Sequence, residues 1–188
     1  MSVPSAVLRS RFQLPIVKVR PGSIVVGVLG EVGPLWFGVH WVGGRQFLCC
    51  ASDEAGCPLC SLGQSRVVGV TMMEIRLQGG RQEFLLELSP LAFSNFESRL
   101  RFAGFDLKCG VQVQVTRARA RGGLRIEPCG PCDRFEMWLD GERRLLNAWA
   151  VLYGLPLSES GESFTQFLER TRSVIEARGR LLLGSHRG

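Results

Sequence analysis

Alternating hydrophobic and polar residues run through the first two thirds of the chain and predict short β-strands. Within Leu35–Val42, Trp36 and His40 face the side opposite Leu35, Phe37 and Val39, because successive side chains of a strand point to opposite faces. Glycine-rich turn signals separate such segments. The pattern predicts strands over Ile16–Arg20, Ser23–Leu29, Leu35–Val42, Arg45–Cys49, Val67–Leu77, Glu83–Leu88, Leu107–Thr116 and Gly123–Glu127.

Helical spacing of apolar residues appears in three segments. Ser89 and Pro90 are typical of a helix start, and the apolar residues that follow recur at helical spacing until Gly104. The last third contains two more amphipathic stretches, Glu142–Tyr153 and Ser160–Arg178. No apolar run approaches the roughly 20 residues that a transmembrane helix needs. We therefore expect a protein without membrane contact, located in the cytoplasm.

Several strands, one helix and then two more strands is the element order of an OB-fold. We predict an α+β chain that is mainly β: an OB-like five-stranded barrel over residues 12–128, followed by a C-terminal helical extension over residues 133–180. An SH3-like or other small Greek-key barrel would give a similar pattern. A length of 188 residues fits one domain with such an appendage.

His40 and the cysteines that follow it form the strongest candidate site. Cys57 and Cys60 are separated by two residues, so one tight turn can present both thiolates to a single ion. With His40 and one cysteine of the pair Cys49–Cys50, they make a set typical of structural zinc. Adjacent strand residues face opposite sides, so only one of the pair can be a ligand. We favour Cys49, which places the zinc-binding loop over residues 40–60.

A second CxxC motif, Cys129-Gly-Pro-Cys132, leaves three interpretations open. The tetrapeptide is that of thioredoxins, but Pro128 stands where an aromatic residue is expected and no βαβ pattern precedes it. The pair could instead join Cys57 and Cys60 in a four-cysteine zinc ribbon, or form a turn between the barrel and the helices. An odd total of seven cysteines favours a reducing compartment over a disulfide framework.

Positive charge on this chain is almost entirely arginine. The formal net charge is +6, from 23 lysines and arginines against 17 acidic residues, and only Lys18 and Lys108 are lysines. The planar guanidinium pairs with phosphate and stacks on bases better than an ammonium does. An arginine excess can also reflect a GC-rich genome. Charge alone therefore indicates only that the chain is able to bind a polyanion.

The segment after Gly110 places arginines where a strand would bury valines. Because three arginines cannot be buried in that way, we expect the hairpin to leave the barrel near Thr116 and to project them into solvent, as an electrostatic track for phosphates. The simpler alternative is a solvated hairpin. Among the aromatics, Trp36 is the best candidate for base stacking, whereas Trp41 falls on a predicted core stripe. The predicted nucleic-acid-binding residues are Trp36, Arg45, Arg66, Arg117, Arg119, Arg121 and Arg125.

His40, Cys49 (or Cys50), Cys57 and Cys60, together with the strand order, resemble the zinc-containing single-stranded DNA-binding proteins of T4-type phages. Those proteins are OB-folds with a zinc subdomain of one histidine and three cysteines. This chain departs from them in its shorter ligand intervals, its single tyrosine and its basic C-terminus.

The resemblance implies sequence-tolerant binding of single-stranded DNA, in replication, recombination or a mobile element, with a structural Zn²⁺. RNA is left open as a ligand. No nucleophile–base set or nucleotide-binding loop is present, so we do not expect an enzyme. The alternative function is a zinc-stapled protein–protein adaptor of a larger nucleoprotein complex, which would bind its partner through the C-terminal helices.

Overall fold

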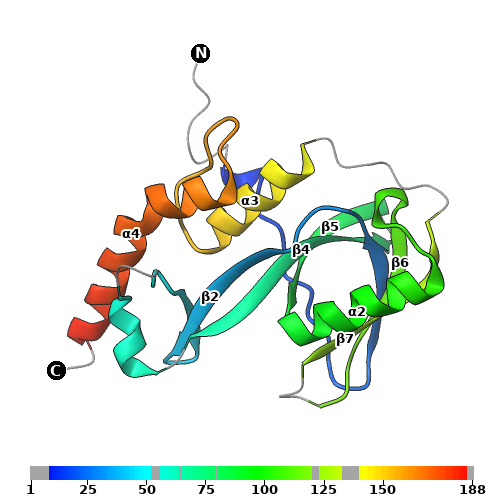
Figure 1. Cartoon of the computed structure of the whole chain (residues 1–188), viewed down its shortest axis with the longest axis horizontal. Coiled ribbons are helices and arrows are strands. Elements are labelled where there is room, and N and C mark those ends of the chain that lie inside the picture. Colours follow the sequence, from blue (N-terminus) through cyan, green and yellow to red (C-terminus); the bar gives the residue numbers. More distant parts are fainter. Residues whose placement is uncertain are drawn as a thin grey trace.

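The computed structural model describes residues 9–51, 56–63, 65–78, 80–119, 123–132 and 140–185. They form an α+β fold with a mostly antiparallel sheet (Figure 1). None of the described helices is both long enough and apolar enough to cross a membrane. In chain order the elements are β1 Ile24–Leu29, β2 Leu35–Val42, β3 Arg45–Leu48, the 3₁₀ turn η1 Pro58–Leu62, β4 Arg66–Leu77, β5 Gly80–Leu88, α2 Pro90–Ala103, the 3₁₀ turn η2 Leu107–Cys109, β6 Val111–Arg117, β7 Leu124–Pro131, α3 Gly141–Leu152 and α4 Phe164–Ser185.

The sheet is organised around β4, the longest strand. Its order is β3-β2-β4-β1-β6-β7, and β5 pairs with β4 outside this path. Strand β2 pairs with the first half of β4 and β1 with the second half, so one strand supports two neighbours in succession. Strand β6 then returns to pair with β1 along its whole length.

The strand pairings do not show the predicted closed five-stranded barrel. Closure of an OB barrel needs a partner for the free edge of β5. In this chain the N-terminal segment lies against that edge, where the backbone N–H of Val17 donates to the carbonyl of Leu85. The strand predicted over Ile16–Arg20 is reduced to the one parallel bridge between Ile16 and Leu85. The N-terminal segment therefore occupies part of the edge needed for closure.

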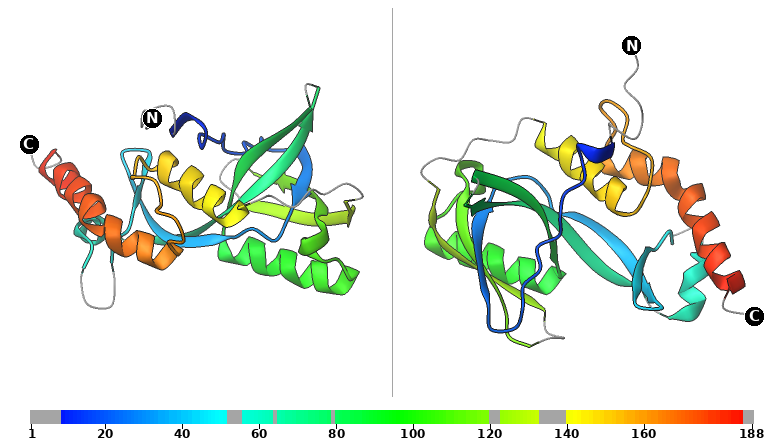
Figure 2. Two further views of the ribbon diagram at one scale, coloured as in Figure 1. Left: turned by 90° about the horizontal axis from the view of Figure 1, so that it is seen from above. Right: turned by 180° about the vertical axis from the view of Figure 1, so that it is seen from behind.

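Two hydrophobic cores lie on the two faces of the sheet, and β4 contributes to both. Val70 and Met72 point into the core shared with α3 and α4, whereas Met73 points into the core shared with α2. Figures 1 and 2 show α2 on one side of the sheet and α3 on the other. The C-terminal helices thus share a core with β2, β3 and the cysteine loop.

Capping residues set the helix limits. Ser89 Oγ accepts a hydrogen bond from the N–H of Ala92, and Gly104 ends α2 in the left-handed conformation, as the sequence predicts.

Helix α4 begins at Phe164, four residues later than predicted. Ser163 and Gln166 form a capping box there, in which each backbone N–H donates to the other residue's side chain.

The Cys129-Gly-Pro-Cys132 segment continues β7 and is not the turn that we considered between barrel and helices. The register pairs Val113 with Pro128 and Gln112 with Gly130, which leaves Cys129 as an extra residue in a β-bulge. Because a bulge absorbs the irregular residues, the strand extends past its predicted end.

Candidate metal centre

Three neighbouring segments bring together the four predicted ligand residues. His40 lies on β2, and Cys49 follows the end of β3. Cys57 immediately precedes the 3₁₀ turn η1, and Cys60 lies within it. The N–H of Cys60 donates to the carbonyl of Cys57 at 3.0 Å, which closes the turn. The ligand atoms of all four residues lie within 4.8 Å of one another.

The distances between ligand atoms fit a tetrahedral ion. Bonds of about 2.3 Å to sulfur and about 2.0 Å to nitrogen would place two sulfurs about 3.8 Å apart and a sulfur and a nitrogen about 3.5 Å apart. The Sγ atoms of Cys49 and Cys60 are 3.8 Å apart. His40 Nε2 lies 3.7 Å from the Sγ of Cys57 and 3.6 Å from the Sγ of Cys60. These three distances are therefore those expected around one tetrahedral ion, and all four ligand atoms lie within 4.8 Å of one another.

Strand parity selects Cys49 over Cys50. The backbone N–H of Cys49 donates to the carbonyl of Gly38 at 2.8 Å, which extends the β2–β3 ladder by one residue. Cys49 consequently shares a face with Gly38 and His40. Cys50 is buried in the core with α3 and α4, beside Cys57, and is not among the four residues whose ligand atoms cluster.

Burial and backbone hydrogen bonds prepare the ligands for a cation. His40 is only 3 % exposed, and its burial lowers the pKa of the imidazole, which favours the neutral form that ligates metals. Burial raises the pKa of the Cys49 thiol to about 11. Burial also opposes ionisation of Cys57, but hydrogen bonds from the backbone of Cys50 and Leu59 outweigh it and lower the pKa of that thiol. A bound cation would supply the charge that stabilises the remaining thiolates.

Gly38 provides the space in which Cys49 lies. A Cβ atom on Gly38 would be 2.9 Å from the Cβ of Cys49 and 3.7 Å from its Sγ. We expect Gly38→Ala to displace this ligand and to weaken metal binding by about 10- to 100-fold, the usual effect of disturbing a residue that orients a ligand. The affinity can be measured by competition with a chromophoric chelator.

Gly56→Ala is the matched control for this substitution. Gly56 is adjacent to Cys57, but nothing lies within 4 Å of the position that its Cβ would take. Its substitution should leave the affinity unchanged. Equal losses from the two variants would contradict the steric explanation.

The metal loop packs against the C-terminal helix. A Cβ on Gly179 of α4 would lie 3.4 Å from the Cγ of Leu59 and 3.6 Å from the Cβ of Pro58, so helix and turn are in close contact. Leu59 is buried in the same core as Trp149 and Phe167. The cysteine turn is therefore an integral part of the core, and Figure 1 shows it beside the C-terminal half of α4.

Trp36 lies on the same face of β2 as the metal ligands. A Cβ on Gly69 would be 2.5 to 2.8 Å from three atoms of its six-membered ring, so the ring lies against the backbone of β4. The Trp36 ring also makes an edge contact with Phe93 at 5.6 Å between centroids. The side chain is partly exposed, so it is held in one position while solvent still reaches part of it.

The six predicted arginines do not form one track. Arg45, Arg66 and Arg119 are exposed and form no ion pair with any described carboxylate, whereas Arg121 lies outside the described residues. Arg125 is exposed and forms an ion pair with Glu127 at 2.6 Å.

Arg117 does not occupy the solvent-facing position that we expected. It is the last residue of β6, and its Nε is buried without a hydrogen-bond partner among the described residues. Burial raises the pKa of the Glu87 carboxyl, and the charge of Arg117 opposes this shift. Strand β6 still pairs with β7 at Arg117, one residue beyond Thr116, so the chain does not leave the sheet at the point where we expected it to.

Trp41 is an exposed aromatic that the sequence assigned to the core. It is 58 % exposed, because β2 extends past the helices that cover Phe37 and Val39. Its position at the end of the alternating stripe, next to Gly43-Gly44, is the one sequence signal that could have indicated exposure.

The second CxxC motif takes no part in the metal cluster of the described residues. The backbone N–H of Cys132 donates to Gly110 at the end of the β6–β7 hairpin. Cys129 lies in a strand, and burial raises its pKa, which is the reverse of an activated thiolate at a helix N-terminus. The four-cysteine ribbon is therefore not formed, and the thiol environment differs from that of a thioredoxin.

Comparison with known proteins finds no matching family model, no matching curated protein and no matching solved structure.

Proposed function

We propose that the cluster of His40, Cys49, Cys57 and Cys60 binds Zn²⁺ and that the ion has a structural role. One imidazole and three thiolates are a ligand set that zinc prefers, and four protein ligands leave no open position for a substrate. The burial of His40 and Cys57 supports the same role. The ion would fix the η1 turn against β2, β3 and α4 and so contribute folding free energy.

We further propose that the chain binds single-stranded DNA without strict sequence preference, and the position of Trp36 is the observation that carries this proposal. A base stacks well on an aromatic ring that is held in place and partly exposed. Trp36 meets both conditions through its contacts with Gly69 and Phe93.

The surroundings of Trp36 favour a strand that runs along β2 toward the metal centre. Trp36 and His40 share a face and lie about 13 Å apart at the usual rise of a strand. Between them Val67, paired with Gly38, is 53 % exposed and offers apolar surface to bases. Exposed Arg45 continues the same face beyond His40, because it pairs with Val42. An aromatic ring for stacking, an apolar surface for the bases and a cation for a phosphate are features that bind an unpaired polynucleotide.

The strand order supports an OB-like relationship. Strands β1, β4 and β5, then α2, then β6 and β7 follow one another as in an OB-fold, and β6 pairs with β1 as the fourth OB strand does with the first. On this interpretation β2, β3 and the metal loop are an insertion between the first two OB strands.

Binding is tested by fluorescence anisotropy with a labelled oligo-dT at two salt concentrations. We expect affinity to fall with salt, with a slope of about −0.7 per phosphate contact. Trp36→Ala should weaken binding by about 1–3 kcal/mol, the value of one stacked base. The same titration with a duplex should give weaker binding.

Phe102→Ala provides the control for this substitution. Phe102 lies on α2 and is 96 % exposed, so it is an accessible aromatic on another element. Its loss should leave oligo-dT affinity unchanged. Affinity that is independent of salt, stronger for duplex or equally reduced in both variants would contradict the proposal.

A further inference from the structure

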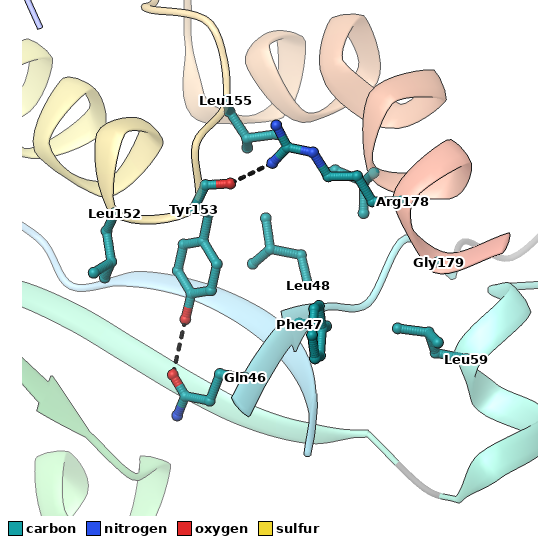
Figure 3. Close-up of a pocket in the computed structure, with 10 residues that line it drawn as sticks. Gln46, Phe47, Leu48, Leu59, Leu152, Tyr153, Leu155, Arg178 and Gly179 are labelled. Atoms are coloured by element: carbon teal, nitrogen blue, oxygen red, sulfur yellow. Dashed lines mark hydrogen bonds between the residues drawn. The ribbon is translucent and has the colours of Figure 1, made fainter. Parts of the chain in front are cut away.

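A pocket lies between the cysteine turn, β3 and the two C-terminal helices. Its volume is about 180 Å³. Figure 3 shows that its lining side chains come from β3, the end of α3, the η1 turn and α4. Four of its lining residues are buried aliphatic side chains: Leu48, Leu59, Leu155 and Ile175.

The size and lining of this pocket suit one aromatic ring. An apolar cavity of about 150 Å³ lined by aliphatic and aromatic residues is large enough to bind benzene. Leu152 and Arg178 are exposed and mark the side that solvent reaches.

Arg178 adds a cation to the mouth of the pocket. Its guanidinium donates hydrogen bonds to the carbonyls of Tyr153 and Gly154, at 2.5 and 2.7 Å. These two bonds hold the group in place and use two of its five N–H donors. No carboxylate in the described part of the chain forms an ion pair with it. A positioned guanidinium with remaining donors is suited to a carboxylate.

We propose that this pocket binds the C-terminal aromatic residue of a partner protein, with the ring between the aliphatic walls and the terminal carboxylate at Arg178. The lining also contains Gln46 and Tyr153, but the Tyr153 hydroxyl donates its hydrogen bond to Gln46. The buried aliphatic side chains therefore favour a phenyl ring over a nucleobase, since a base has several polar edge atoms to satisfy. The carboxylate complements the one cation of the lining. This inference does not depend on the binding of DNA.

Metal occupancy should control the pocket. Leu59 forms one wall and lies between Cys57 and Cys60, so its position depends on the ion that both thiolates would hold. Gly179, which also lines the pocket, contacts Leu59. Removal of the ion would therefore release a wall of the pocket.

The probe is N-acetyl-L-phenylalanine, titrated into the metal-loaded protein and followed by NMR chemical shifts. N-acetyl-L-phenylalanine amide carries the same ring without the carboxylate. The acid should bind about tenfold more tightly than the amide, because one charge-assisted hydrogen-bonding group is lost. Addition of a chelator should abolish the binding of the acid. Equal affinity for acid and amide, or tighter binding of uridine monophosphate, would overturn the proposal.

Two tryptophan variants locate the site. Leu152→Trp narrows the mouth of the pocket and should weaken binding of the acid at least about tenfold. Leu181→Trp places the same side chain on an exposed part of α4 that does not line the pocket, and it should have no effect. Unchanged binding in Leu152→Trp would place the ligand elsewhere. The comparison of acid and amide on the unmodified protein decides the question even if Leu152→Trp fails to fold.

Discussion

Replacement of Cys49 by alanine should remove the bound metal ion and lower the free energy of unfolding by more than about 4 kcal/mol, as loss of a structural metal site does. The physical reason is that the ion would join the η1 turn to β2 and β3, and its loss leaves the packing of Pro58 and Leu59 against α4 as the main contact of the turn. Leu59 is its one buried residue, and the turn is fixed by Cys57 and Cys60. Metal content by elemental analysis and unfolding in urea followed by circular dichroism measure the two effects.

Cys50→Ala is the matched control, because the two cysteines are adjacent and only Cys49 belongs to the cluster of four ligand atoms. Cys50 is buried in the core with α3 and α4, with its thiol beside that of Cys57. The Cys50→Ala variant should retain one ion per chain. Its free energy of unfolding should fall by about 1 kcal/mol, similar to the loss of one buried methyl group. Loss of the ion from Cys50→Ala together with its retention in Cys49→Ala would exchange the roles of the two residues.

Replacement of Trp149 by alanine should lower the free energy of unfolding by about 3–5 kcal/mol, the usual range for a buried tryptophan. Trp149 is fully buried in α3 and contacts four aromatic rings: Phe37, Tyr153, Phe164 and Phe167. These rings belong to β2, α3 and α4, so the loss of Trp149 opens a cavity where sheet and helices meet. Thermal and urea unfolding of the metal-loaded variant will show the change.

The substitution Trp149→Phe distinguishes the packing of the aromatic ring from the effect of the buried indole N–H. The indole Nε1 is buried and finds no hydrogen-bond partner among the described residues. Phenylalanine keeps one aromatic ring in place and removes that unsatisfied donor, whose burial costs about 1–3 kcal/mol. We expect Trp149→Phe to lose less than half as much stability as Trp149→Ala. Equal losses would mean that the second ring of the indole provides most of the packing.

Local patterns were sufficient to predict the candidate metal site. The spacing of Cys57 and Cys60 places both thiols on one turn, and the alternation of strand residues allows only one of Cys49 and Cys50 to be a ligand. The structure places Cys49 in the cluster, as we favoured. Both rules act over a few residues, so no knowledge of the rest of the fold is needed. The limits of β2 and the caps of α2 were predicted for the same reason.

Residues whose environment depends on distant segments were predicted less well. The alternating pattern correctly predicted that the valines of β6 are buried. It could not predict that Arg117 would remain part of β6, near Glu87. It could not show that Trp41 lies beyond the reach of the covering helices. A turn was one of three interpretations of the Cys129-Gly-Pro-Cys132 motif, because a bulge cannot be distinguished from a chain break by composition alone.

The sequence by itself determined most of the strands, the limits of α2 and the four residues of the candidate metal cluster, because each depends on side chains that are neighbours along the chain or across one turn. Only the tertiary structure decided that the N-terminal segment takes the free edge of β5, that α3 and α4 share a core with the metal loop, and that these elements leave a pocket beside Arg178. Those features arise from contacts between residues far apart in the chain, and their free energy depends on how well whole surfaces fit together.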